Sequence, residues 1–169
     1  MGTRADFYVG RGRDAEWLGS IAWDGYPGGI EPKTAETYQP WPGARMRHQE
    51  GTWPEGEHLF DATDEQTYRQ RVARFFEYRD DVTLPAEGWP WPWGNSQTTD
   101  YAYAFDDGTV HASCFGYAWF DPTQAEPDHD DQKQCEFPDM KDRMNVKFGG
   151  PGSGLIVVAA DAEGRVSVS

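Results

Sequence analysis

The sequence has few cysteines, no long apolar run and, over much of its length, few basic residues. The chain of 169 residues has two cysteines, Cys114 and Cys135, which is typical of reduced thiols in a cytoplasmic protein. A disulfide between the two is the alternative. No apolar run reaches ten residues, so we expect neither a transmembrane helix nor a secretion signal. The scarcity of bases and a pI of about 4.5 argue against direct binding of nucleic acid, which needs a basic surface.

The acidic charge is concentrated between residues 80 and 142. These 63 residues carry 14 Asp or Glu against only Lys133 and Lys141, a net charge of −12 out of −14 for the whole chain. The same stretch holds 11 aromatic residues, whereas disordered acidic segments are poor in them. We therefore expect a folded region with a concentrated negative surface, which favours a binding protein over an enzyme.

Residue alternation predicts three β-hairpins. The first two have short turns at residues 10–14 and at Asp107-Gly108, where glycine lets the backbone reverse. The third contains a continuous apolar run, which favours a central strand covered on both faces. The predicted strands are 3–9, 17–23, 100–107, 109–120, 155–160 and 165–168.

One amphipathic helix is predicted over about residues 63–79. Thr63 as N-cap and Gln66 three residues later form a capping box. Apolar residues then recur at helical spacing, at Tyr68, Val72, Phe75 and Phe76. A short second helix is expected at 32–38, and residues 39–60 show no period.

These elements predict an α+β fold in a single domain spanning residues 1–169. The expected architecture is an antiparallel sheet of several hairpins with the main helix packed on it. Nineteen glycines and twelve prolines predict long Pro/Gly-rich loops between the elements.

Several motifs resemble catalytic or metal sites but have the wrong context. Residues 10–15 nominally match a dinucleotide-binding fingerprint, yet a β-like run follows where a helix is needed. The glycine loop at 149–154 lacks the Lys-Ser/Thr of a phosphate-binding loop. Four His and Cys side chains, of the types that bind zinc, form a candidate set, but their spacing does not fit a zinc site. They are His111, Cys114, His129 and Cys135.

The loop from Glu126 to Asp131 holds carboxylates of the kind that bind calcium, but it lacks the EF-hand spacing and its central glycine. We interpret it as a solvated acidic loop. The sequence thus assigns no catalytic residue, no metal ligand and no cofactor.

Trp89-Pro90-Trp91-Pro92-Trp93 is the least ordinary segment. Alternating proline stiffens it and prevents strand pairing through the proline nitrogens. Such rigid aromatic side chains are common interface anchors. Two interpretations stay open: the tryptophans dock on a partner, or they cap one end of the core.

Three short motifs carry a resemblance. Thr3-Arg4 begins the first strand, Trp23-Asp24-Gly25-Tyr26-Pro27 ends the next, and Tyr101-Ala102-Tyr103-Ala104-Phe105-Asp106 forms a later strand. In these features the chain resembles a loose group of small uncharacterised bacterial and phage proteins. The similarity covers about residues 3–30 and 99–120. It implies a phage or mobile-element setting and no particular chemistry.

We therefore expect an acidic, non-enzymatic binding protein, phage-encoded and acting in the host cytoplasm. It would engage a basic surface of a host nucleic-acid-handling or defence protein and inhibit it by imitating nucleic-acid phosphates. Two alternatives are a small hydrolase or metal-dependent enzyme acting on a sugar or nucleotide, and a self-associating structural phage component. The expected partner-binding residues are Asp121, Glu126, Asp128, Asp130, Asp131, Glu136, Asp139, Trp89, Trp91 and Trp93.

Overall fold

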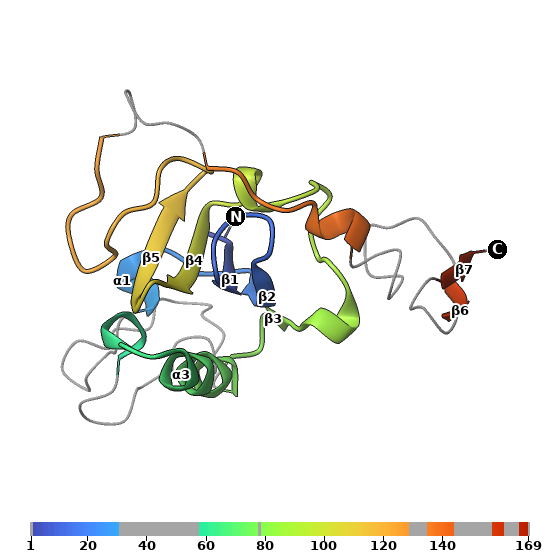
Figure 1. The fold of residues 1–169 in the computed structure, drawn as a ribbon, viewed down its shortest axis with the longest axis horizontal. Helices are drawn as coiled ribbons and strands as arrows, with labels where there is room; N and C mark the ends of the chain where they lie inside the picture. The colour runs from blue at the N-terminus through green and yellow to red at the C-terminus, as the bar shows by residue number, and fades with distance from the viewer. Residues whose placement is uncertain are drawn as a thin grey trace.

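The main sheet has five strands in the order β3-β2-β1-β4-β5 (Figure 1). The computed structural model describes residues 2–30, 58–77, 79–128 and 135–143, together with the backbone of two further strands at 157–160 and 166–168. The sheet strands are β1 (Ala5–Val9), β2 (Glu16–Ile21), β3 (Val82–Thr83), β4 (Tyr101–Asp106) and β5 (Thr109–Cys114). With one main helix beside them, they confirm the α+β class.

Two of the predicted hairpins form this sheet. β1 pairs with β2 and β4 pairs with β5, both antiparallel, although β5 ends at Cys114 and is shorter than predicted. Asp107 and Gly108 between β4 and β5 both have positive φ, at 53° and 78°. A two-residue turn of this kind matches the right-handed twist of the strands and needs residues that tolerate that backbone region.

The expectation of a purely antiparallel sheet was wrong. β1 and β4 pair in parallel over their full length, from Ala5 opposite Tyr101 to Val9 opposite Phe105. Nearly a hundred residues separate the partners, and the connection passes through the main helix. The two hairpins are thus joined at the centre of the sheet by this parallel pair.

Both faces of the sheet are covered, because alternate residues of each central strand enter different apolar clusters. Phe7 and Tyr103 stack at 5.4 Å on the helix side, where Phe75 meets Phe7 edge-on at 5.9 Å. Tyr8 and Ala104 belong to a second cluster on the opposite face. Because both faces are covered, Asp6, the one polar residue of β1, is buried and does not mark a solvent-exposed face.

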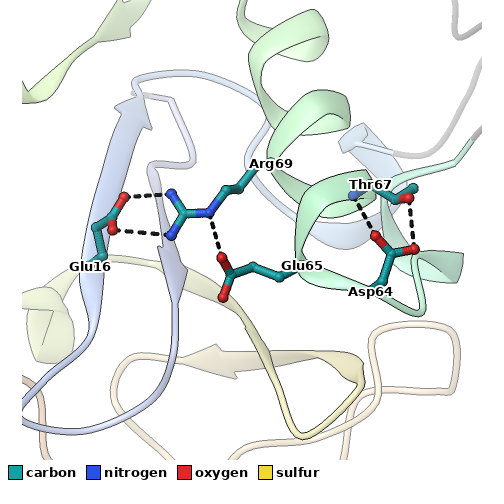
Figure 2. A network of polar contacts seen from close by, with 5 residues as sticks. All are labelled: Glu16, Asp64, Glu65, Thr67 and Arg69. Atoms are coloured by element: carbon teal, nitrogen blue, oxygen red, sulfur yellow. Dashed lines mark hydrogen bonds and ion pairs between the residues drawn. The ribbon is translucent and has the colours of Figure 1, made fainter.

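The main helix, α3, spans Glu65–Glu77 and buries Tyr68, Val72 and Phe75, as its apolar spacing predicts. The predicted cap is wrong by one residue. The carboxylate of Asp64 accepts hydrogen bonds from the backbone N and Oγ1 of Thr67, both at 2.8 Å (Figure 2). Asp64 thus satisfies a free backbone N–H at the positive end of the helix.

Four short helical turns complete the described part: α1 (Pro27–Ile30), η1 (Leu59–Asp61), η2 (Pro85–Glu87) and η3 (Ser96–Thr98). Leu59 and Phe60 of η1 are buried against the helix-side cluster. In the described ranges no helix is long and apolar enough to cross a membrane.

The C-terminal hairpin forms, but the prediction of a central strand there was wrong. β6 (Val157–Ala160) and β7 (Val166–Val168) make a separate two-stranded antiparallel sheet. The predicted helix at 32–38, most of the loop at 39–60 and the glycine loop at 149–154 lie outside the described residues.

Candidate functional site

The acidic candidates that the structure describes are all exposed. Asp121, Glu126 and Asp128 lie on the segment that follows β5, which we call the acidic loop (Asp121–Asp128). Glu136 and Asp139 lie on the later segment 135–143. Asp130 and Asp131 fall outside the described residues. Figure 1 shows the acidic loop beside β5, whereas segment 135–143 runs away from it towards the other end of the view.

Local hydrogen bonds fix the shape of the acidic loop. The Oδ1 atom of Asp121 accepts from the hydroxyl and the backbone N of Thr123, at 2.6 and 2.9 Å, and these bonds lower the pKa of Asp121. Tyr101 of β4 donates its hydroxyl hydrogen to Glu126 Oε2 at 2.8 Å. The loop is therefore tied to the sheet at its far end and carries an ionised carboxylate at its start.

Segment 135–143 has a mixed charge. Asp139 accepts a hydrogen bond from the backbone N of Asp142 at 3.1 Å, and with Asp142 it lines a cavity of about 600 Å³. Arg13 and Arg143 line the same cavity. Glu136 lines a neighbouring cavity of about 570 Å³, again beside Arg13.

The tryptophan segment lies mainly in the core. Trp89 is 0% and Trp91 9% exposed, so the expectation that they dock on a partner is wrong and the core-capping interpretation holds for these two. Trp93 is half-buried and stacks on Trp91 at 5.6 Å. The guanidinium of Arg4 lies over both rings, 5.5 and 5.6 Å from their centroids. Every indole N–H in the segment has a partner, as burial requires.

A buried carboxylate holds this segment on the sheet. Asp6 of β1 is 0% exposed, and its Oδ1 accepts from Ser20 Oγ at 2.5 Å and from Trp91 Nε1 at 2.7 Å. Its Oδ2 accepts from Ser96 Oγ at 2.5 Å. Because the hydrogen of Ser96 is used here, Tyr8 donates its hydroxyl hydrogen to Ser96. Asp6 thus joins β1, β2 and two loop positions in one network.

Burial raises the pKa of Asp6, against the opposing effect of the hydrogen bonds from Ser20, Ser96, Trp91 and Thr99. Burial likewise raises the pKa of Tyr8 well above its usual range. Perturbed groups of this kind are catalytic candidates when they line a cleft. Asp6 and Tyr8 are closed off from solvent, so in this conformation the network is structural and no substrate reaches it.

Sequence reasoning missed Asp6. A single aspartate between apolar residues in a strand is typical of an outward-facing position. The only available signal was the polar partners of Asp6, Ser20 on the neighbouring strand β2 and Ser96 in η3, and it becomes visible only once the tertiary contacts are known.

The two cysteines are free and lie on opposite faces of the sheet. Cys114 pairs in register with Tyr101, and burial together with the neighbouring Glu126 raises the pKa of its thiol to about 12. Cys135 donates its thiol hydrogen to the carbonyl of Tyr117 at 2.8 Å, beside Ser113. Since Ser113 and Cys114 are consecutive in β5, their side chains point to opposite faces, which separates the two thiols.

We therefore expect no disulfide and slow alkylation of both thiols in the folded protein, because the pKa of each is raised. Iodoacetamide labelling at pH 8, followed by mass spectrometry, should modify both cysteines rapidly in urea and slowly without it. Rapid labelling of Cys135 in the folded state, or a cross-link between the two under air, would contradict this arrangement.

The described residues show no geometry that supports the possible zinc or calcium sites. His111 Nε2 lies 3.0 Å from the carbonyl oxygen of Asp106, and His129 is outside the described ranges. Among the residues that are described, no three or more His, Cys, Asp or Glu side chains gather as metal ligands would.

Comparisons with known proteins identify no relative: no protein-family model, no curated protein and no solved structure matches this chain.

Proposed function

We propose that the chain is a non-enzymatic binding protein whose acidic loop engages a basic surface of another protein. The observation that carries the proposal is the exposure of Asp121, Glu126 and Asp128 on a loop that Tyr101 ties to the sheet. A loop already held in place loses little conformational freedom on binding. The −14 charge of the chain would add electrostatic steering towards a basic target.

The partner in this proposal is a host protein that handles nucleic acid or acts in defence, and blocking its phosphate-binding groove would inhibit it. Charge and the resemblance to small phage proteins support this part. With such a partner, the chain would act in the host cytoplasm. The self-associating alternative needs the tryptophan segment as a surface, and the burial of Trp89 and Trp91 leaves only Trp93 partly exposed there, so we favour the binding protein.

The test is capture of partners from a bacterial lysate by the immobilised chain, at about 0.05 M and about 0.5 M salt. Replacing Asp121→Asn, Glu126→Gln and Asp128→Asn together is expected to lower capture of a basic protein at least about fivefold at low salt, because it removes steering charge. Glutamine at 126 keeps an acceptor for Tyr101, so the loop should stay in place.

The matched control changes three exposed acids away from the loop and from other proposed binding residues, Asp14→Asn, Asp80→Asn and Asp142→Asn, with the same change in net charge. It should capture the partner nearly as well as the parent chain. Equal capture by the loop variant and the parent, or capture that survives high salt unchanged, would contradict the proposal.

A further inference from the structure

A second surface of the molecule is apolar. A groove of about 520 Å³ runs between α3 and the β3 edge of the sheet. Its apolar lining comes from Leu18, Val72, Ala73, Phe76, Val82 and Leu84. Strand order places this groove at the β3 edge, whereas the acidic loop follows β5 at the opposite edge. The two surfaces are therefore distinct.

The floor of the groove is built on the core. Phe76 is half-buried and packs edge-on against Phe7 at 5.4 Å. It also covers Gly19, where an added Cβ would lie 2.7 Å from the Phe76 ring and 3.0 Å from the Thr83 carbonyl oxygen. Gly19 has φ of 151°, so both the space and the backbone favour glycine. This close contact fixes the position of the ring.

The rim is also held in place. Leu84 is 46% exposed, an unusual exposure for a large apolar side chain at the mouth of an apolar groove. Its backbone N donates to Glu87 Oε2 at 2.7 Å, and Pro85 begins the turn that follows. A preformed groove with a fixed rim binds a partner at a low entropic cost.

The charge around the mouth is negative. Arg69 lines the groove, but Glu16 binds its Nη1 and Nη2 at 2.6 and 3.1 Å, and Glu65 binds its Nε at 2.9 Å (Figure 2). Glu77 and Glu87 lie on the rim. The groove lining itself carries two carboxylates against one guanidinium, a net charge of −1, and the two carboxylates that bind Arg69 add negative charge beside it. An occupant with cationic flanks would complement it.

We propose that this groove binds an amphipathic segment of a partner protein, with apolar side chains in the groove and Lys or Arg at its flanks. Docking of such a segment along a helix is a common recognition mode, in which apolar residues provide affinity and flanking charges provide orientation. This inference does not rest on the acidic loop, so either surface can fail its test without the other.

The probe is a fluorescein-labelled helical peptide of Leu and Lys, compared by fluorescence anisotropy with a Leu and Glu peptide of the same pattern. We expect the Lys peptide to bind the parent chain and the Glu peptide to bind at least about tenfold more weakly, since its charge opposes that of the mouth. The double variant Ala73→Gln with Leu84→Gln should lose at least about tenfold in affinity for the Lys peptide, because it covers the groove with polar atoms.

Two controls keep the result specific. Ala125→Gln places the same substitution on the acidic loop, and the triple loop variant tests whether charge alone attracts the probe; both should bind the Lys peptide like the parent. Ala73 and Leu84 are exposed, so urea unfolding of the groove variant should match the parent. Unchanged affinity in the groove variant, loss of binding in the loop variant, or a groove-dependent dimer that forms without peptide would each overturn the proposal.

Discussion

Replacing Asp6 by alanine is expected to lower the free energy of unfolding by about 4 kcal/mol. The substitution leaves three buried donors without their acceptor: the hydroxyls of Ser20 and Ser96 and the indole N–H of Trp91. Each orphaned donor costs about 1–3 kcal/mol, and removal of a desolvated charge offsets part of that sum. Urea unfolding followed by the combined fluorescence of the eight tryptophans measures the loss.

Asp6→Asn is the informative control because it keeps the shape and one acceptor. The folded pKa of Asp6 is raised above the value of about 3.9 in an unfolded chain, so the folded state binds the proton more tightly. The stability from this group is thus fully present below about pH 3.9 and is lost as pH rises through the folded pKa. The parent should therefore lose stability relative to Asp6→Asn between pH 4 and its folded pKa. A difference independent of pH would contradict the raised pKa.

The hairpins were predictable because their signals are local. Asp107-Gly108 carries its own turn chemistry, and alternation on either side sets the pairing. The same holds for α3, whose apolar spacing names the buried side chains. Its cap was misplaced because Thr63 and Asp64 are both good N-caps, and only the geometry of the Thr67 amide decides between them.

The parallel pairing of β1 and β4 could not be read from the sequence. It depends on a partner about a hundred residues away, and residues near each strand give no information on that choice. The same pairing places Asp6 and Tyr8 beneath the tryptophan segment. Proline in that segment excludes strand pairing, as expected, but it does not decide between exposure and burial.

The candidate surface was predicted in part. Composition indicates that acidic loop residues are exposed, and the five described acidic candidates are. Their division into an acidic loop and a segment lined with Arg13 and Arg143 depends on the tertiary path of the chain. The apolar groove was missed because its lining comes from three separate stretches around Leu18, Phe76 and Leu84.

Asp81→Asn is expected to lower the free energy of unfolding by about 4 kcal/mol, because it removes the buried carboxylate charge that pairs with the guanidinium of Arg79. The two side chains are 3% and 1% exposed and form two bonds of 2.8 Å. Asp81 Oδ2 also accepts from the backbone N of Ala22 and Trp23, at 3.1 and 2.9 Å. The pair therefore joins the end of β2 to the chain that leaves α3.

The matched control is Asp106→Asn, which breaks the partly exposed 2.9 Å pair with Arg11 and should cost no more than about 1 kcal/mol. Combining Arg79→Gln with Asp81→Asn should cost less than the sum of the two single losses, since each single substitution already breaks the contact between the two side chains. Additive losses in urea unfolding would show that the two residues stabilise the fold independently. Coupled losses, with β2 released first in hydrogen exchange, would identify this ion pair as the contact that holds the sheet edge and, with it, the wall of the apolar groove formed by Leu18 and Val82.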